Sequence, residues 1–270
     1  MSRNGLALRS LFRRHRRHQQ QSRIICVTGM HSGGTSAVAR VVNLLGVYLG
    51  PIEEVSAPAP GYNLRGLWEY LEMTRVSDGI LRTLGGSWDV LPALERGWHR
   101  SSALEPQRER VAELVAATFA GEPVWGWKDP RSCLLLPFWE DVRGPVEVVA
   151  VVRNPNDVVA SLGSRNGFDR EHALALWERY AAGMLAALKT HRSTALVYED
   201  LWDGPEAFAS LAEFLGRTGA ERTAEFAAAI AAWIDESMWH HRSGRDEKSA
   251  IAGLSTEQRD LYEALVSHAA

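Results

Sequence analysis

A glycine-rich segment between two apolar runs constrains the fold of this chain more than any other feature. Residues 29–36 read GMHSGGTS and have the Gly-x4-Gly spacing of a phosphate-binding loop. The apolar residues 24–27 before them predict a strand, and the apolar periodicity of residues 37–45 predicts a helix. In such a strand–loop–helix unit, backbone N–H groups and the helix N-terminus converge on an anion. The segment is therefore either an anion site or a plain strand-to-helix turn.

The loop differs from that of the nucleotide triphosphatases at one position. Thr35 stands where their motif has Lys, which reaches the β- and γ-phosphates. The backbone amides around Gly33, Gly34 and Thr35 are still expected to hold a phosphate, with the hydroxyls of Ser32 and Ser36 beside them. We therefore expect an anion site that does not carry ordinary ATP chemistry.

The rest of the chain alternates predicted strands with predicted helices. Strands are expected at residues 124–127, 146–152 and 194–198, and the run VEVVAVV at 146–152 is typical of a strand buried on both faces. Helices are expected at residues 68–84, 106–119, 156–164, 171–188, 205–215, 220–234 and 256–268, and a long loop at residues 53–66. Strands joined by crossover helices predict an α/β fold, a three-layer sandwich around a central parallel sheet.

Composition sets further bounds. The chain has 270 residues with ordinary hydrophobic (46%) and charged (23%) content and no internal repeat, so residues 23–270 are expected to form one domain. The two cysteines, Cys26 and Cys133, argue against a disulfide framework and favour a cytoplasmic location. The sequence has no cluster of Cys and His with metal-ligand spacing, so we expect no bound metal.

The N-terminus is strongly basic. The first 23 residues hold seven Arg and no Asp or Glu, and residues 1–22 are predicted to be a disordered arm. The arm lacks the apolar core of a signal peptide, and the chain has no apolar stretch of about 18 residues that would span a membrane. The arm is either a solvated tail or a weak contact to anionic membranes, and nucleic acid is not an expected partner.

Charged residues follow the other three predicted strands. Lys128 follows the second strand, Arg153 follows the third, with Ser161 eight positions later, and Glu199 follows the fourth. Because ligands of open α/β sheets bind at the carboxyl ends of the strands, these residues are expected near the glycine loop. Lys128 and Arg153 are either structural partners of carboxylates or ligands of a polyanion, and their convergence favours the polyanion. A triphosphatase is expected to have an Asp for Mg²⁺ at such a strand end, where this chain has Arg153.

In their order and spacing, these pieces resemble the bacterial sulfotransferases that use 3′-phosphoadenosine 5′-phosphosulfate (PAPS). Residues 29–36 resemble the loop that holds the 5′-phosphosulfate, and residues 153–161 resemble the segment that holds the 3′-phosphate. Three further elements are similar: Gly66-Leu67-Trp68-Glu69, Trp127-Lys128-Asp129-Pro130-Arg131 and Tyr198-Glu199-Asp200-Leu201. The resemblance covers residues 23–245 and implies a P-loop-NTPase-like sulfotransferase fold.

The resemblance also implies roles for individual residues. The residues expected to bind PAPS are Ser32, Gly33, Gly34, Thr35, Ser36, Arg153 and Ser161, together with Arg242. Arg242 belongs to the basic stretch 239–245, which either covers the 3′-phosphate or is a solvated loop between helices. Lys128 is expected to be a cation near the sulfuryl group, and Glu69 or His31 a general base. Each base candidate has a structural alternative, Glu69 as the ion-pair partner of Lys128 and His31 as a support of the loop.

The implied reaction moves a sulfuryl group from PAPS to a hydroxyl or amine of an acceptor. The expected acceptor is a small molecule or glycan: a carbohydrate, a lipid or a small metabolite. The reaction is expected to need no metal. Trp88, Trp98 and Trp139 either line the acceptor pocket or belong to the core.

Two positions depart from the family: Gly33 replaces a usual Ser, and the change at Ser32 is the more important one. Ser32 stands where these enzymes usually have Lys or Arg, and Lys128, Arg131 or His31 are candidates to replace that cation. Two other functions therefore stay open. One is a nucleotide or small-molecule kinase, and the other is a catalytically degenerate nucleotide-binding protein.

Overall fold

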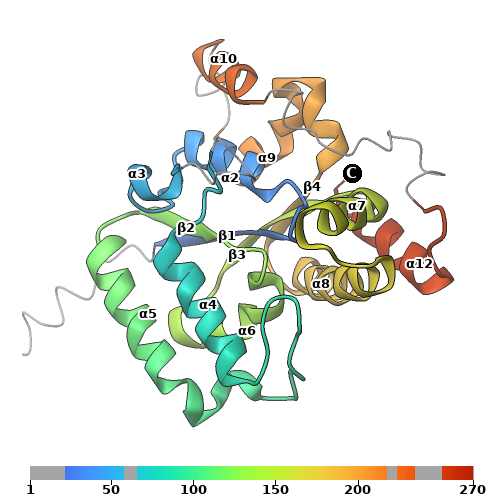
Figure 1. The fold of residues 1–270 in the computed structure, drawn as a ribbon. Coiled ribbons are helices and arrows are strands. Elements are labelled where there is room, and N and C mark those ends of the chain that lie inside the picture. Colours follow the sequence, from blue (N-terminus) through green and yellow to red (C-terminus); the bar gives the residue numbers. More distant parts are fainter. Residues whose placement is uncertain (1–21, 58–65, 218–223, 235–250, 270) are drawn as a thin grey trace, which may run out of the picture.

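The computed structural model describes residues 22–57, 66–217, 224–234 and 251–269. Within these residues, four strands form one sheet: β1 (Arg23–Gly29), β2 (Val124–Lys128), β3 (Glu147–Val152) and β4 (Ser193–Val197). All neighbouring pairs are parallel, in the order β2-β1-β3-β4 (Figure 1). The two central strands, β1 and β3, are buried along almost their whole length. The predicted α/β fold with a central parallel sheet is confirmed.

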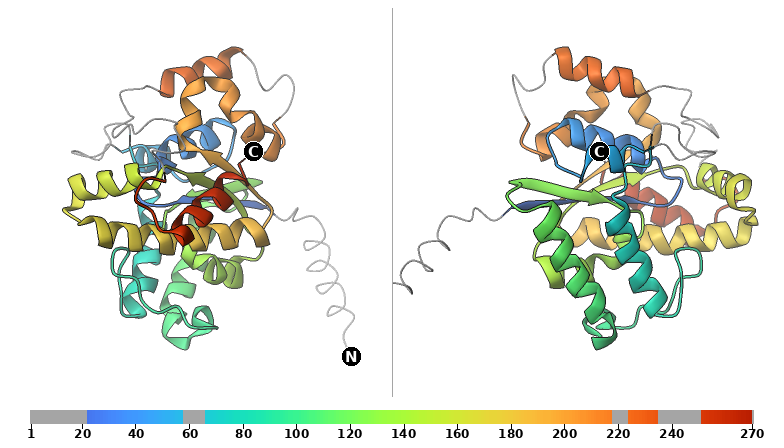
Figure 2. Two further views of the ribbon diagram at one scale, coloured as in Figure 1. Left: turned by 90° about the vertical axis from the view of Figure 1, so that its right-hand side faces the viewer. Right: turned by 60° about the vertical axis from the view of Figure 1, so that its left-hand side comes forward.

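Helices cover both faces of this sheet (Figures 1 and 2). One face carries α2 (Thr35–Leu44), α9 (Ala209–Phe214) and α10 (Ala224–Trp233). The other face carries α4 (Leu71–Thr83), α5 (Glu105–Thr118), α6 (Ser132–Arg143) and α8 (Arg170–Thr190). Helices α7 (Pro155–Asn166) and α12 (Thr256–Val266) pack against α8. The arrangement is the predicted three-layer sandwich.

The connections contain shorter elements. They are the helix α3 (Ile52–Val55) and the 3-10 turns Trp98–Arg100, Ser102–Leu104, Tyr198–Asp203 and Pro205–Phe208. Helix α3 corrects the prediction of a loop from residue 53 onward. Pro51 precedes it, and Glu53 and Glu54 stand in its first turn, where carboxylates interact favourably with the helix dipole. Residues 58–65 of the predicted loop lie outside the described residues.

Helix α6 is absent from the sequence predictions. Pro137 lies inside it, and an internal proline removes a backbone hydrogen bond at a cost of about 3 kcal/mol. The same helix buries Leu135, Phe138 and Trp139 completely in the core. Burying each such side chain contributes about 1.5–3 kcal/mol, so the packing outweighs the proline.

The helix predicted from residue 68 begins three residues later, at Leu71. Trp68 has a φ of 57°, a left-handed conformation that interrupts the helix. Its side chain is buried against Trp233 of α10 in an edge-to-face contact at 5.7 Å between ring centroids, and Arg40 lies 4.7 Å from the ring. These contacts across the fold outweigh the local helical pattern.

Two other predictions fall largely beyond the described part of the chain. Residues 1–21 of the basic arm lie outside it, as does Arg242. In the part that is described, no helix has both the length and the apolar character needed to cross a bilayer.

Candidate functional site

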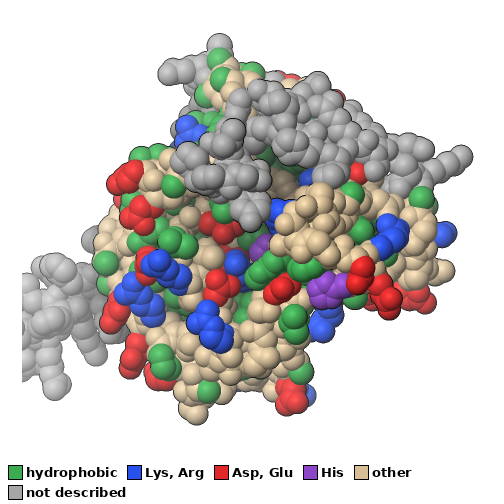
Figure 3. All heavy atoms as spheres, in the orientation of Figure 1, with side chains coloured by type: hydrophobic (Ala, Val, Ile, Leu, Met, Phe, Trp, Pro, Cys, Tyr) green, Lys and Arg blue, Asp and Glu red, His purple; other side chains and the backbone are tan. Residues whose placement is uncertain are grey.

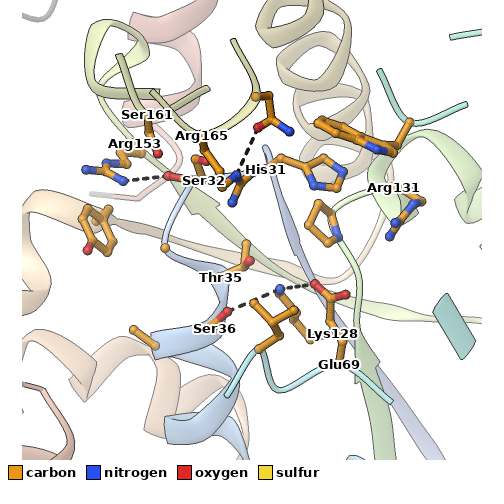
Figure 4. Close-up of a pocket in the computed structure, with 17 residues that line it drawn as sticks. His31, Ser32, Thr35, Ser36, Glu69, Lys128, Arg131, Arg153, Ser161 and Arg165 are labelled. Atoms are coloured by element: carbon orange, nitrogen blue, oxygen red, sulfur yellow. Dashed lines mark hydrogen bonds and ion pairs between the residues drawn. The ribbon is translucent and has the colours of Figure 1, made fainter. Parts of the chain in front are cut away.

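A cavity of about 360 Å³ lies at the carboxyl-terminal edge of the sheet (Figure 4). Its walls come from the β1–α2 loop, from the ends of β2 and β3, from the last turns of α7 and from the segment before α4. In the space-filling view, basic, acidic and histidine side chains lie close together near the middle of this face (Figure 3). The glycine loop, Lys128 and Arg153 thus share one cavity, as the strand order requires. Glu199 does not line it, and its Oε1 accepts a hydrogen bond from the backbone amide of Asn154 at 2.9 Å.

The loop between β1 and α2 is built from two left-handed residues. Ser32 has a φ of 62°, and Gly34, which precedes α2, has a φ of 82°. A Cβ on Gly34 would lie 1.9 Å from the ring of Tyr198, so only glycine allows this close packing. The amide of Gly33 donates to the carbonyl of Met30 at 2.9 Å, inside the turn.

This geometry sharpens the prediction for the loop amides. The first amides of an α-helix have no acceptor inside the helix, and here they belong to Thr35 and Ser36, which both line the cavity. Gly33 does not line the cavity, and its amide closes the turn. An anion in the cavity would therefore meet the start of α2 rather than Gly33.

Lys128 ends β2 and is buried, with 4% of its side chain exposed. Its Nζ lies 2.5 Å from Oε1 of Glu69 and 3.5 Å from Oγ of Ser36 (Figure 4). Glu69 is 17% exposed, and it lines the same cavity. The ion-pair alternative for Glu69 is thus what the structure shows, and it places a carboxylate and an ammonium side by side in the cavity.

Arg131 lies beside this pair and is held by two carboxylates. Its guanidinium is 2.7 Å from Oδ1 of Asp129 and 2.9 Å from Oδ1 of Asp78. Burial alone would lower the pKa of Arg131, but the charges of Asp129 and Asp78 raise it. Arg131 is therefore a permanently charged, fixed part of the cavity wall.

The opposite side of the cavity comes from β3 and α7. Arg153 follows β3 and donates through Nη1 to the backbone carbonyl of Ser32 at 2.7 Å. Its guanidinium also lies 4.5 Å from the centre of the Tyr198 ring, a cation–π contact. Ser161, two turns into α7, lines the same region (Figure 4). The two residues predicted to act together are thus brought to one end of the cavity.

His31 is buried between aromatic rings. Its ring centroid lies 4.4 Å from that of Trp88 and 5.5 Å from that of Tyr180, and among the described residues its Nε2 has no hydrogen-bond partner. Burial lowers the pKa of His31 well below its usual 6.5, and the charges of Arg131, Lys128 and Arg165 lower it further. His31 is therefore neutral at pH 7 and a weak base.

The three tryptophans considered for an acceptor pocket lie in different parts of the fold. Trp88 lines the cavity, whereas Trp139 is completely buried in the core beside Trp127. Trp98 packs against the main core and does not line the cavity. The carbonyl of Trp88 accepts a hydrogen bond from the Tyr180 hydroxyl at 2.9 Å, which fixes the position of its loop.

Some cavity residues escaped the sequence interpretation. Leu67, Arg165, Asn166 and the ring of Tyr198 all line the cavity. Arg165 follows Ser161 by four residues, and this spacing places both on one face of a helix. That signal was available in the sequence. The part of the chain that the structure describes contains no group of three or more His, Cys, Asp or Glu placed to hold a metal ion.

Comparisons with known proteins bear on the fold. No protein-family model matches the sequence, and no curated protein matches it either.

Solved structures do match. The sulfotransferase domain of the olefin synthase from Synechococcus PCC 7002 is 17% identical with a TM-score of 0.50, covering 92% of this chain and 96% of that domain. Sulfotransferase STF9 from Mycobacterium avium is 15% identical with a TM-score of 0.51, covering 92% and 76% of the two chains. Sulfotransferase STF1 from Mycobacterium tuberculosis is 18% identical with a TM-score of 0.54, covering 91% and 81%. The chain therefore has the P-loop-like fold of these bacterial sulfotransferases.

Proposed function

We propose that this protein transfers a sulfuryl group from PAPS to a hydroxyl or amine of a carbohydrate, lipid or small metabolite. The observation that carries the proposal is a single cavity with two separate cationic ends. Lys128 ends β2 and Arg153 follows β3, and β1 lies between these strands. Two strand spacings of about 4.8 Å put these backbone ends roughly 10 Å apart. PAPS carries two separate anionic groups, the 3′-phosphate and the 5′-phosphosulfate.

The Arg153 end suits the 3′-phosphate. The guanidinium of Arg153 is a planar fork that binds two phosphate oxygens at once, and the Ser161 hydroxyl is a short polar donor on the adjacent helix. The 3′-phosphate distinguishes PAPS from ATP, so this end is expected to give the donor specificity. Arg242 stays a proposed ligand of the same phosphate, outside the described residues.

The Lys128 end suits the reacting group. Sulfuryl transfer is analogous to phosphoryl transfer, in which attack and departure are roughly in line and negative charge builds on the leaving oxygen. The amides at the start of α2 and the Nζ of Lys128 are preorganised donors for the leaving 5′-phosphate oxygen. Such donors act without reorganisation, since helix α2 fixes the amides and Ser36 and Glu69 hold the Lys128 ammonium.

Glu69 is the proposed general base. The acceptor O–H or N–H gives its proton to the Glu69 carboxylate, the acceptor atom forms a bond to sulfur, and the bond from sulfur to the 5′-phosphate oxygen breaks. The electron pair of that bond goes to the phosphate oxygen. His31 is the weaker candidate because its imidazole is buried among cations that oppose protonation.

Two residues argue against a nucleotide kinase. Thr35 stands in place of the lysine that reaches the β- and γ-phosphates, and Arg153 stands at the strand end where a metal-binding Asp is expected. A kinase of this loop type uses the loop lysine and a metal ion to neutralise the phosphates. In this chain, Lys128 and Arg153 are the candidates for that role.

Thermal stability in the presence of ligands tests the proposal. Adenosine 3′,5′-bisphosphate, the product that PAPS leaves, is expected to stabilise the protein by about 2.7 kcal/mol at 100 times its Kd, whereas ATP with Mg²⁺ is not. At the same ligand concentration, Arg153→Ala is expected to reduce the shift to about 1.4 kcal/mol or less, and Arg153→Lys to retain more of it. Arg259→Ala removes an exposed helical arginine on α12, outside the cavity, and is expected to leave the shift unchanged.

Each other outcome contradicts the proposal. A shift with ATP and Mg²⁺ alone would favour a kinase. No shift with either ligand would exclude a donor site of this kind. A shift with the bisphosphate that is undiminished in Arg153→Ala would place the 3′-phosphate elsewhere.

A further inference from the structure

The glycine loop contains no cation. Residues 29–36 include neither Lys nor Arg, so every positive charge that faces a ligand in the cavity comes from another element. Among the described residues, four such side chains line the cavity: Lys128, Arg131, Arg153 and Arg165. Transferring groups of this kind spread negative charge over three equatorial oxygens, which cations and preorganised donors stabilise. The question is which of the four reaches those oxygens.

Three of the four have defined positions. Lys128 is paired with Glu69 on the α2 side of the cavity. Arg131 is held in the wall by Asp129 and Asp78. Arg153 lies on the Tyr198 ring and donates to the carbonyl of Ser32, at the end proposed for the 3′-phosphate.

Arg165 lies in the last turn of α7, four residues after Ser161. Unlike the other three it is an exposed residue, and its Nε donates to the amide oxygen of Asn166 at 3.1 Å. Its side chain extends toward the loop residues His31 and Ser32, on the other side of the cavity from Lys128 (Figure 4). The positive charge of Arg165 is close enough to help lower the pKa of His31. Arg165 thus brings a cation from outside the loop to the middle of the loop.

We propose that Arg165 contacts the transferring sulfuryl group and supplies the cation that the glycine loop lacks at Ser32. This proposal rests on the proposed function. The guanidinium fork binds two of the three equatorial oxygens, while Lys128 approaches from the other side of the cavity. A hydrogen bond from Arg165 to an anionic oxygen is stronger than its bond to the neutral amide oxygen of Asn166, because donor and acceptor are then both charged.

Two simpler roles compete with this one. A basic residue in the last turn of a helix interacts favourably with the helix dipole, and this role needs no ligand. Arg165 also shares a helix face with Ser161, so it is close enough in sequence to serve the 3′-phosphate instead. The first role affects folding only, and the second affects every ligand with a 3′-phosphate. Neither depends on whether the sulfuryl group is present.

The experiment therefore compares PAPS with adenosine 3′,5′-bisphosphate, which has the same 3′-phosphate and no sulfuryl group. In Arg165→Met, the conversion of PAPS to the bisphosphate, with water or an added acceptor, is expected to slow by about 10²–10³-fold. The Kd of the bisphosphate is expected to stay within about twofold of the wild-type value. Arg165→Lys is expected to retain part of the rate. Arg259→Met, the matched exposed helical arginine, is expected to change neither quantity.

A second-site variant makes the assignment sharper. Ser32→Arg, made in the background of Arg165→Met, places a cation on the loop itself. The double variant is expected to convert PAPS at least tenfold faster than Arg165→Met alone. A double variant that stays as slow as Arg165→Met, with unchanged bisphosphate binding, would overturn the proposal that the two positions serve the same group.

The remaining outcomes are also decisive. Arg165→Met with a wild-type rate would show a structural role and overturn the proposal. Arg165→Met with bisphosphate affinity lost as in Arg153→Ala would assign Arg165 to the 3′-phosphate and overturn it as well. A wild-type protein that neither binds the bisphosphate nor converts PAPS would instead overturn the proposed function itself.

Discussion

The two ends of the cavity hold their cations in different ways. At the β2 end, Lys128 is buried and forms an ion pair with the carboxylate of Glu69 at 2.5 Å. At the β3 end, Arg153 lies on the ring of Tyr198 and donates to a backbone carbonyl. The first arrangement couples a cation directly to a proton acceptor. The second presents a planar donor fork on a rigid aromatic support.

Under the proposed function, this difference assigns the chemistry to the β2 end and donor recognition to the β3 end. A buried ion pair contributes little to stability, because the cost of removing two charges from water offsets their attraction. A pair kept in that position is therefore better explained by what it does in the cavity than by what it adds to the fold. An arginine on an aromatic ring keeps its fork oriented, which suits the binding of a phosphate that does not react.

The largest expected effect concerns the β2 end. Lys128→Met keeps the length of the side chain and removes its charge, so the leaving oxygen loses a preorganised donor. We expect the conversion of PAPS to slow by about 10²–10³-fold, while the affinity for adenosine 3′,5′-bisphosphate falls much less. Steady-state rates together with calorimetric titration of the bisphosphate measure both quantities.

A surface pair offers the matched control. Arg110 and Glu72 are also 2.5 Å apart, but the arginine side chain is 47% exposed. Arg110→Met is expected to leave the rate unchanged and to change the stability of the fold little, because exposed ion pairs contribute little. If Lys128→Met also left the rate unchanged, the β2 end would have no part in the chemistry.

The next effect concerns the support of the β3 end. Gly34→Ala would force a methyl group onto the ring of Tyr198, which carries Arg153. Gly121→Ala is the matched control, because Gly121 also has a positive φ, of 88°, but a Cβ there would meet nothing within 4 Å. Gly34→Ala is expected to lower the free energy of unfolding by about 1–3 kcal/mol more than Gly121→Ala, as overpacking does.

Chemical denaturation measures this difference, and bisphosphate binding shows where the damage lies. Gly34→Ala is expected to weaken bisphosphate binding, whereas Gly121→Ala is not. Equal losses of stability in both variants would mean that backbone strain alone matters and that the contact with Tyr198 is dispensable.

The smallest effect concerns His31, which lies between the two ends. In the folded protein its pKa lies well below 6.5, and in the unfolded chain it is about 6.5. Below pH 6.5 the unfolded chain therefore binds a proton that the folded protein does not. The stability that neutral His31 contributes is present above pH 6.5 and is lost as the pH falls.

His31→Gln isolates this contribution. We expect the difference in unfolding free energy between the wild type and His31→Gln to shrink by about 1.4 kcal/mol per pH unit between pH 6 and pH 5. Denaturation curves at several pH values measure the slope. Parallel stability curves for the two proteins would show that His31 is not held neutral.

Sequence patterns predicted the frame of the site because that frame is set by strand ends. The residues after parallel strands must meet at one edge of a sheet, so the sequence predicts that Lys128 and Arg153 lie near the loop, and both line the cavity. Ser161 followed from its helical position after Arg153.

Contacts between distant segments account for what the sequence patterns missed. Helix α6 contains Pro137, and only its packing in the core explains why it forms. The left-handed turn at Trp68 depends on Trp233, more than 160 residues away in the chain. Arg165 is the exception. Its four-residue spacing from Ser161 is visible in the sequence, but the spacing alone does not show that Arg165 lines the cavity.

Titration of two nucleotides tests the two-ended cavity most directly. Adenosine 3′,5′-bisphosphate and adenosine 5′-monophosphate differ only in the 3′-phosphate, and each is titrated into the wild type and Arg153→Ala. A charge-assisted hydrogen bond is worth about 1.5–3 kcal/mol. We predict that Arg153→Ala raises the Kd of the bisphosphate by about 10–150-fold and the Kd of the monophosphate by less than threefold. Equal weakening of both nucleotides would contradict the assignment of Arg153 to the 3′-phosphate and with it the account of a two-ended donor site.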